Sequence, residues 1–484
     1  MNVKVISTNV GRALLVSALF MFISMLISIG DGMDSAFAPL SISFIITFIT
    51  GAFPFIFVRK SEAISLQDGF MIIVLSWILS FLFGMLPYVM WGGEFSLVNA
   101  LFESVSGYTT TGSTILTNVE GLPRSLIFWR SSTHFIGGLG VVVFLLLIMP
   151  NASPFRLRLT NIELSSLSRE GYRTRSVKTV YITAMVYVGL VLVETLMLML
   201  AGMSFFDAVN HSFSTVATGG FSTRNASISY YDSTAINLIV MFFMVVSSLH
   251  FGMLFMVFST RSVKPLKNPV VKFFLWSIVI MTVLVTLSLK FQGGYTSWGK
   301  ALMDASFQVC SYVTTTGFGS VDNREWPLFS LLVLAYALFQ CGCSGSTAGG
   351  VKADRMYIAV KAMVCQIRKR LHPSSSVVQI RLGNHLVEDD VALPVILYIV
   401  LYSALIAVSI ILLVLCGVAP VEAFSGALSS MANAGAAMGD LSSLGSYAGQ
   451  PAVAKLIYSL DMFLGRVEIY PLFVIVYLLF KRGK

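Results

Sequence analysis

Charged residues are scarce in this sequence, and their scarcity argues against an ordinary soluble protein. Only 11% of the 484 residues are charged, against roughly a quarter in soluble globular domains. The hydrophobic share is 56%. The composition therefore predicts a protein that crosses a membrane many times.

Cysteine frameworks and nucleotide-binding motifs are also missing. The five cysteines are odd in number and show no framework spacing, which argues against structural disulfides. Cys341 and Cys343 could ligate a metal, but no second Cys/His pair accompanies them, so packed thiols are favoured. No Walker motif occurs, and FIGGLG (135–140) lies inside an apolar stretch, where it indicates helix packing. The chain itself is therefore expected to bind no nucleotide.

The net charge of +9 comes from basic residues in short segments between apolar runs. This placement favours the positive-inside rule over nucleic-acid binding. GDGMD (30–34) and YYD (230–232) are acidic and alternate with the basic segments. The basic segments are 59–62, 153–178, 261–268, 352–370 and 481–484. The alternation predicts a multi-pass protein of the bacterial inner membrane with both termini in the cytoplasm.

Ten apolar stretches are long enough to cross a bilayer, which takes about 20 residues. The first follows Lys4 and Arg12, but it is too long for a signal peptide and lacks a good cleavage site, so we interpret it as a retained transmembrane helix. The ten stretches are 11–30, 37–58, 70–92, 124–149, 178–201, 235–258, 271–291, 327–362, 391–417 and 452–480.

A polar, glycine-containing stretch occurs four times between these spans. The copies read NALFESVSGYTTTGS from Asn99, DAVNHSFSTVATGGF from Asp207, DASFQVCSYVTTTGF from Asp304 and EAFSGALSSMANAGA from Glu422. A glycine follows each first residue at the same offset, at Gly112, Gly220, Gly317 and Gly435. A shared offset in four copies indicates internal repetition, with each unit built as helix, re-entrant segment and helix.

Each re-entrant helix is expected to reach only halfway across the bilayer, since thirteen residues of helix span about 20 Å. Its polar first residue is the predicted N-cap, so the partial negative charge of its C-terminus points to the membrane centre. The extended chain beyond must be buried or line a wet cavity, and four such loops around one axis form a ring of carbonyl oxygens. Glycine supplies the backbone angles that aim successive carbonyls the same way.

The four loops contain no carboxylate, and neutral oxygens suit a large monovalent cation better than a divalent one. Asp232, Asp322 and Asp440 follow their loops and either concentrate cations at the mouth or act as turn residues.

These features predict an all-α polytopic membrane protein with four pseudo-symmetric helix–pore-loop–helix repeats around one pore, preceded by an N-terminal helix pair. The predicted units are the helix pair at 1–62 and repeats at 63–152, 153–262, 263–372 and 373–484. The second helix of the third repeat is expected to be broken.

With its four motifs and flanking helices, the chain resembles the Trk/Ktr/HKT superfamily of potassium transporters, in its TrkH-type membrane subunit. The resemblance implies a pore selective for K⁺ and Rb⁺ over Na⁺ and Li⁺, and no enzyme activity. Each glycine stands in for the first glycine of the channel signature TVGYG. The implied K⁺-binding filter is Thr110, Thr111, Gly112, Thr218, Gly219, Gly220, Thr315, Thr316, Gly317, Asn433, Ala434 and Gly435. Gly219 and the fourth repeat depart from the usual threonines.

A gate is expected below this filter. The segment GCSGSTAGG interrupts a run from Pro327 to Leu371 that would measure about 68 Å as one helix, too long for a 30 Å span. Its glycines Gly342, Gly345, Gly349 and Gly350 form either the family's gating loop or a packing kink. Arg466 lies near the middle of the last span, where the family keeps a basic pore residue; a structural ion pair with another helix is the alternative. Glu468 is too close in sequence to face Arg466 on one helix.

The family also implies a homodimer in the lipid bilayer and a cytosolic ring of RCK-type, TrkA-like subunits. That ring would bind the controlling nucleotide, ATP/ADP or NAD. The basic segments 153–178 and 352–386 are the candidate docking surface.

Two other functions remain open from the residues alone. A proton- or sodium-coupled secondary transporter would use broken helices and titratable groups such as His134, His211 and His250. More remotely, GCSG (342–345) matches a motif of intramembrane serine proteases, with Ser344 and His250 as the pair. The common orientation of the four repeats favours the pore.

Overall fold

The fold is almost entirely helical. A computed structural model describes residues 2–58, 65–148, 176–371, 380–382, 385–387 and 389–482. A short hairpin is the exception, in which β1 (Ile380–Leu382) pairs antiparallel with β2 (His385–Val387). The predicted all-α class is confirmed. The hairpin was not predicted, because strands of three residues are too short to leave a pattern in the sequence.

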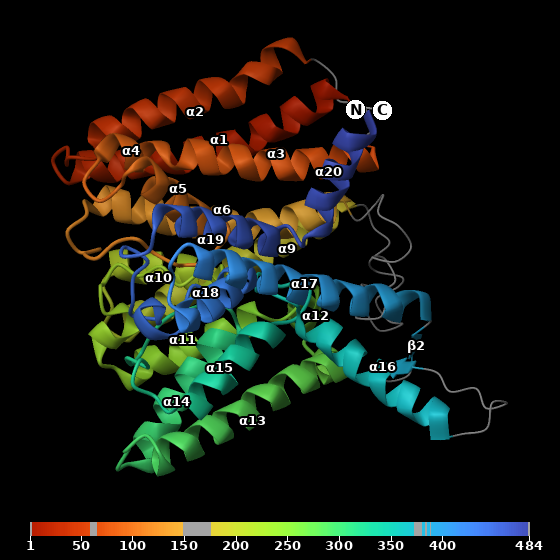
Figure 1. The fold of residues 1–484 in the computed structure, drawn as a ribbon. Helices are drawn as coiled ribbons and strands as arrows, with labels where there is room; N and C mark the ends of the chain where they lie inside the picture. The colour runs from red at the N-terminus through yellow and green to blue at the C-terminus, as the bar shows by residue number, and fades with distance from the viewer. Residues whose placement is uncertain are drawn as a thin grey trace.

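The N-terminal pair, α1 (Val3–Gly30) and α2 (Phe37–Phe57), lies along α3 at one edge of the molecule (Figure 1). Gly11 and Gly51 let the two helices touch, since a Cβ on Gly11 would lie 2.6 Å from the Gly51 carbonyl oxygen. Small residues at such contacts are a common means of helix packing in membranes.

Four units follow, each with a pore helix (α5, α10, α14 or α18) between flanking helices. The first holds α3 (Leu66–Gly84), α4 (Leu86–Trp91), α5 (Leu97–Tyr108) and α6 (Arg124–Ile148). The second holds α9 (Ser176–Leu200), α10 (Phe205–Val216), η1 (Ser227–Tyr231), α11 (Thr234–Ser247), α12 (Phe251–Thr260) and η2 (Lys264–Lys267). The third holds α13 (Pro269–Phe291), α14 (Trp298–Val313), α15 (Leu328–Gln340) and α16 (Ala353–Leu371). The fourth holds α17 (Asp389–Leu415), α18 (Pro420–Ala432), η3 (Gly439–Leu441), α19 (Ala452–Arg466) and α20 (Tyr470–Arg482).

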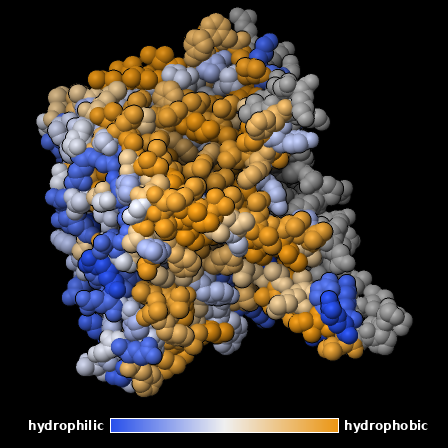
Figure 2. Space-filling view, viewed as in Figure 1, coloured by the Kyte–Doolittle hydropathy of each residue, from blue (hydrophilic) through white to orange (hydrophobic). Residues whose placement is uncertain are grey.

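The long helices run across the view of Figure 1, and α1 begins on the side where α20 ends. We call this the termini side and the opposite one the mouth side. Figure 2 shows an apolar surface across the middle and hydrophilic residues gathered along the mouth side. Exposed residues of the belt include Leu192, Phe242 and Ile411, each at least half exposed. An exposed apolar belt between polar edges is the surface that a bilayer requires.

Six described helices are long and apolar enough to cross a membrane, and a seventh crossing forms if α11 and α12 count as one broken span. Two predicted spans are wrong as continuous helices. The span 235–258 bends by 103° between α11 and α12, and the span 452–480 is interrupted between α19 and α20. The predicted break in the span that begins at Pro327 is confirmed, between α15 and α16.

The predicted N-caps of the pore helices are also wrong. The hydroxyls of Ser96, Ser204 and Ser297 accept the capping hydrogen bonds, and α18 begins with Pro420. Asn99, Asp207 and Glu422 lie three residues into their helices and Asp304 lies further along. Serine caps a helix as well as asparagine or aspartate does, so the repeated spacing marked a position inside each helix and not its start.

Candidate ion-selective site

The four pore helices end in the same way at the centre of the molecule. In each, the chain folds back onto the end of the helix. The N–H groups of Thr110, Thr218, Thr315 and Asn433 donate to carbonyls three residues earlier, at 2.9–3.1 Å. The next N–H groups, of Thr111, Gly219, Thr316 and Ala434, donate to carbonyls five residues earlier, at 2.8–3.0 Å. Such bonds satisfy orphan carbonyls at a helix C-terminus. Each helix end thus leads into a short extended segment that ends at the filter glycine, and we call these four segments the filter strands.

The sign of the backbone angle φ alternates along each filter strand. φ is +53° at Thr110, +55° at Thr218, +58° at Thr315 and +55° at Asn433, and the filter glycines two residues later have φ of +73° to +84°. The residue between them does not have positive φ in any of the four strands. Left-handed angles are rare for β-branched residues, and they persist where the surrounding structure enforces them. Alternation of this kind turns successive carbonyls toward one side of the strand.

The four strands close into a ring. A Cβ built on Gly112 would lie 1.9 Å from the carbonyl oxygen of Gly219, and one on Gly220 would lie 2.1 Å from that of Thr316. One on Gly317 would lie 2.1 Å from the Ala434 oxygen, and one on Gly435 would lie 2.3 Å from the Thr111 oxygen. Each glycine therefore packs against the carbonyl of the next repeat, and the fourth repeat packs against the first. Any side chain at these glycines would push neighbouring strands apart.

Side chains behind the ring differ between repeats. The hydroxyls of Thr109 and Thr111 lie 2.8 Å apart in the first repeat, as do those of Thr314 and Thr316 in the third. In the fourth, Asn433 Nδ2 donates to Thr111 Oγ1 at 3.1 Å and to the Met462 carbonyl at 2.7 Å. The ring has neutral oxygens throughout, as the sequence predicts.

A cavity of about 400 Å³ lies over the ring on the mouth side, lined by Gly112, Gly220 and Gly317 among others. Three arginines reach it, and each has a carboxylate partner. The pairs are Arg130–Glu103 at 2.6 Å, Arg224–Asp207 at 3.0 Å and Arg324–Asp322 at 2.5 Å. The balance of charge in this vestibule therefore depends on Asp440, which also lines it and is exposed.

The three acidic residues predicted at the mouth have different surroundings. Hydrogen bonds from Arg324 lower the pKa of Asp322, so this carboxylate stays ionised but is neutralised by its partner. Asp232 ends η1 with φ of +40°, which is the turn role. Asp440, in η3, forms no ion pair in the part of the chain that the structure describes. Of the three, Asp440 is the one that lines the vestibule, and among the described residues its charge has no ion-pair partner there.

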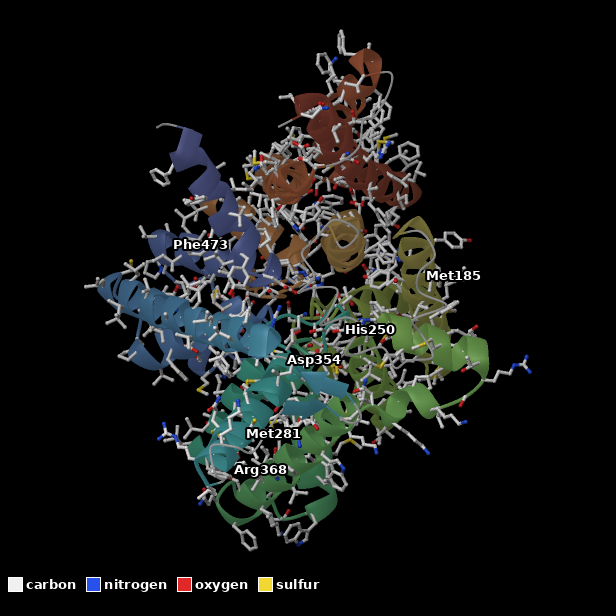
Figure 3. All side chains as sticks on the ribbon, turned by 90° about the vertical axis from the view of Figure 1, so that its right-hand side faces the viewer. Met185, His250, Met281, Asp354, Arg368 and Phe473 are labelled. Atoms are coloured by element: carbon white, nitrogen blue, oxygen red, sulfur yellow. The ribbon has the colours of Figure 1, made fainter. Side chains whose placement is uncertain are left out.

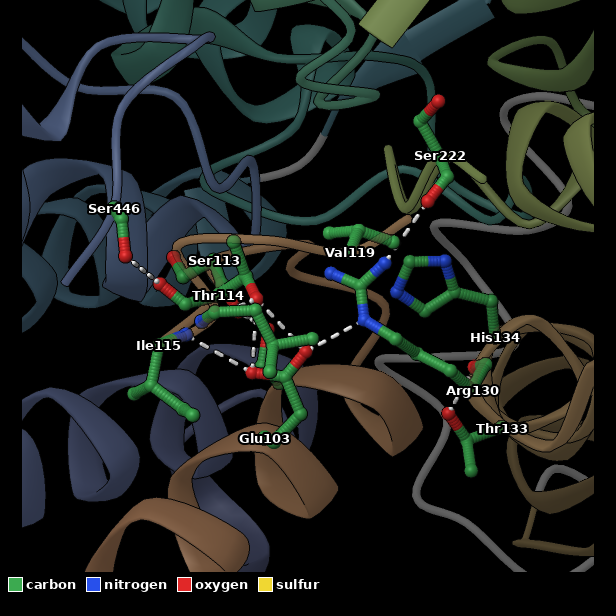
Figure 4. Close-up of polar contacts among 12 residues, drawn as sticks. Glu103, Ser113, Thr114, Ile115, Val119, Arg130, Thr133, His134, Ser222 and Ser446 are labelled. Atoms are coloured by element: carbon green, nitrogen blue, oxygen red, sulfur yellow. Dashed lines mark hydrogen bonds and ion pairs between the residues drawn. The ribbon is translucent and has the colours of Figure 1, made fainter. Parts of the chain in front are cut away.

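A buried polar residue at one register of three pore helices braces the chain beyond the ring. Glu103 accepts from Thr114 Oγ1 at 2.9 Å, from the Ile115 N–H at 3.0 Å and from Arg130 Nε (Figure 4). The corresponding His211 bonds Ser222 Oγ at 2.9 Å, and Gln308 donates to the Val321 carbonyl at 3.0 Å. Arg130 also donates to the Ser222 carbonyl at 3.1 Å, which ties the first repeat to the second.

The glycine-rich break lies directly against the termini side of the ring. Thr347 Oγ1 donates to the Val216 carbonyl at the end of α10 at 2.9 Å, and the Gly349 N–H donates to Thr315 Oγ1 at 3.0 Å. A Cβ on Gly349 would lie 2.0 Å from the Ala432 carbonyl oxygen at the end of α18. This loop, residues 341–352, thus touches three of the four strand entrances.

The loop is also bonded to the break between α11 and α12. The Cys343 N–H donates to the Ser248 carbonyl at 2.9 Å and the Phe251 N–H to the Gly345 carbonyl at 3.1 Å. Viewed from the termini side, His250 and Asp354 lie near the centre of the molecule (Figure 3). Gly345 and Gly350 have φ of +74° and +69°, which few other residues adopt cheaply.

Arg466 is buried at the end of α19 and holds the loop. Its guanidinium donates to the Thr347 carbonyl at 2.7 Å and to the Gly137 carbonyl at 3.4 Å. Among the described residues it forms no ion pair with a carboxylate. Glu468, in the break between α19 and α20, pairs with Arg355 of α16 at 2.9 Å. Helix α19 ends at Arg466, so the two residues do not lie on one helix.

The Arg355–Glu468 pair connects two helix breaks, and Glu468→Gln is expected to loosen both. Truncating one partner of a largely buried ion pair costs about 2–5 kcal/mol. Amide hydrogen exchange measured by mass spectrometry should rise at least about tenfold in the first turn of α16, since 1.4 kcal/mol is a factor of ten. Asp322→Asn in an exposed pair is the control, and it should change exchange little. Equal exchange in the Glu468→Gln variant and the native protein would contradict the role of the pair.

The remaining candidate residues have structural roles. His250 Nδ1 accepts from the Gly252 N–H at 3.0 Å and caps α12. Gly137 and Gly138 let α6 touch the ends of α5 and α10, as expected for FIGGLG. All five cysteines are free thiols, and no group of metal-ligating side chains occurs among the described residues.

A membrane-embedded ring of four helix-directed loops, with an interrupting loop beneath it, defines a membrane transport protein. The chain belongs to the TrkH family of cation transport proteins, which it matches over residues 39–484. It is 34% identical to the Trk system potassium uptake protein TrkH of Salmonella typhimurium over 78% of each chain, and 32% identical to TrkI of Halomonas elongata over 80% of this chain and 79% of the relative. The crystal structure of the potassium transporter TrkH from Vibrio parahaemolyticus matches with a TM-score of 0.89 at 29% identity, over 98% of each chain. These relatives are named as transporters and not as enzymes, which confirms that expectation.

Proposed function

We propose that this chain takes up K⁺ through a selective filter formed by the four strands that end at Gly112, Gly220, Gly317 and Gly435. The observation that carries the proposal is the closed ring, in which each filter glycine packs on a carbonyl of the next repeat. A ring of neutral carbonyl oxygens replaces the hydration shell of a monovalent cation. The relatives named as potassium uptake proteins support K⁺ as the ion. Rb⁺ should follow K⁺, and Na⁺ and Li⁺ should be excluded.

The loop at 341–352 is proposed as the gate. Gly342, Gly345, Gly349 and Gly350 allow it to lie against the ring, and Arg466 holds it there while placing a positive charge below the filter. Opening requires that Thr347 and Gly349 leave the strand entrances. The packing-kink alternative predicts no change of flux when these contacts are broken.

The surroundings of the protein are proposed as follows. The chain lies in a bacterial inner membrane as a homodimer, with the termini side in the cytoplasm, because the basic segments 59–62 and 261–268 alternate with acidic ones. A cytosolic RCK-type ring that binds ATP/ADP or NAD would control the gate. Its candidate docking segment 153–178 lies mostly outside the described residues, whereas 352–386 includes α16 and the start of the hairpin.

Gly317→Ser tests the filter. We expect the native protein in liposomes to take up K⁺ and Rb⁺ but not Na⁺ or Li⁺. The serine side chain would meet the Ala434 carbonyl oxygen, because a Cβ there already lies 2.1 Å away, so the strands must part and Na⁺ should enter. The measurement is cation flux with each of the four ions. The control is Gly299→Ser, at a position where a Cβ would meet only Ser297 Oγ, at an ordinary contact distance of 3.8 Å.

No cation flux in the native protein under several gating conditions, with the cytosolic partner present, would overturn the pore. K⁺ flux that requires a proton or sodium gradient would instead favour the coupled transporter.

A further inference from the structure

The filter strand of the second repeat lacks the side chains that back the strands of the first and third repeats. Those repeats have a pair of threonine hydroxyls behind the strand, whereas the second has Ala217 and Gly219 at the matching positions. The backbone does not require glycine at Gly219, because its φ lies outside the left-handed region. Something other than backbone conformation therefore excludes a side chain there.

The imidazole of His134 occupies that space. A Cβ built on Gly219 would lie 2.4 Å from His134 Nδ1 and within 2.7 Å of two ring carbons. His134 comes from α6 of the first repeat and is fully buried. The second repeat thus has its strand backed by a residue of its neighbour.

His134 is held from two directions. Its Nδ1 lies 3.1 Å from Ser214 Oγ on α10, and its ring stacks on Phe221 with centroids 4.0 Å apart and planes at 15°. The Arg130 guanidinium lies 3.5 Å from the same Phe221 centroid. Because two groups this near cannot share one face, Phe221 is sandwiched between them. Such stacks add rigidity beyond plain burial.

The position of Gly219 matters to two strands. Its carbonyl oxygen packs against Gly112 of the first repeat, where a Cβ would lie 1.9 Å away. A shift of Gly219 toward an empty space behind it would therefore widen the ring between the first two repeats. A wider ring would admit Na⁺ together with its water and would coordinate K⁺ less closely.

We propose that His134 is a filter-positioning residue whose ring replaces the missing threonine of the second repeat and sets ion discrimination at Gly219. This inference rests on the proposed function. It predicts that His134 and residue 219 share one space, so that a larger residue at one position requires a smaller one at the other.

The test is a size exchange, read as the ratio of K⁺ to Na⁺ flux in liposomes. His134→Ala should keep K⁺ flux but lower the ratio at least about tenfold, the scale of discrimination that a small change of packing supports. Gly219→Thr alone should lower K⁺ flux at least about tenfold, because the side chain meets the imidazole. The double variant His134→Ala with Gly219→Thr should recover flux and ratio to within about threefold of the native protein.

Two further variants separate positioning from folding. His134→Phe keeps a ring on Phe221 and should retain most of the selectivity. Ser132→Ala removes a hydroxyl whose one hydrogen bond among the described residues goes to the Phe128 carbonyl of its own helix, at 2.7 Å, and it should behave as native. Each variant is first checked for a monodisperse gel-filtration peak.

If His134→Ala kept the native ratio of K⁺ to Na⁺ flux, the inference would be overturned while the proposed pore would stand. Full K⁺ flux in Gly219→Thr with His134 in place would have the same meaning. A double variant that is no better than the worse single variant would overturn it as well. Absence of K⁺ flux in the native protein would overturn the proposed function and this inference together.

Discussion

Replacing Glu103 by Ala should destabilise the protein by about 3–5 kcal/mol, because it leaves the Arg130 charge buried without its partner. Glu103 is fully buried, and Arg130 is 2% exposed. The carboxylate also accepts from Thr114 and Ile115 beyond the first filter strand. Thermal unfolding in detergent should therefore show a clear fall in the midpoint, and K⁺ flux should fall with it.

The control for this prediction is removal of both charges. Replacing a buried ion pair by apolar residues of similar volume is often nearly neutral. Glu103→Leu combined with Arg130→Met should therefore be more stable than Glu103→Leu alone, and the double-mutant cycle measures the coupling between them. If the double variant lost as much stability as both single losses added together, the pair would not be the cause.

Replacing Arg466 by Ala should raise K⁺ flux in the absence of any cytosolic partner. The guanidinium is buried beside the interrupting loop and bonded to the Thr347 carbonyl. A unit charge about 10 Å from a K⁺ ion raises its energy by roughly 1.7 kcal/mol at an effective dielectric constant near 20, which is about twentyfold in rate. Loss of the bond to Thr347 should add to this by freeing the loop.

Arg466→Lys and Arg466→Gln separate the two contributions. Lysine keeps the charge and should keep flux low, whereas glutamine keeps a donor without charge and should raise flux almost as much as alanine. The measurement is ⁸⁶Rb⁺ uptake into liposomes with each variant at equal reconstitution. Uptake that stays at the native level in both the alanine and the glutamine variants would contradict a gating role for Arg466.

The repeated loops could be predicted from the sequence because their geometry is local. Each filter glycine lies at a fixed offset within its own copy, and its left-handed φ is a property of a few consecutive residues. The break after Gln340 could be predicted for the same reason, since glycine and serine crowd one stretch of chain. The breaks at Ser248 and Val467 were not predicted, because each lies in a mostly apolar stretch of about one span's length. The contacts at these breaks, with the loop and with Arg355, come from distant parts of the chain.

The sequence by itself determined that this is a membrane protein with four equivalent loops of neutral oxygens, since composition and internal repetition reflect local requirements of bilayer and backbone. Only the tertiary structure decided how buried polar groups are partnered. Arg466 bonds a carbonyl 329 residues away at Gly137, and His134 fills a space left by Gly219 in another repeat. Burying a polar group requires a partner wherever the fold supplies one, and no periodicity along the chain records where that is.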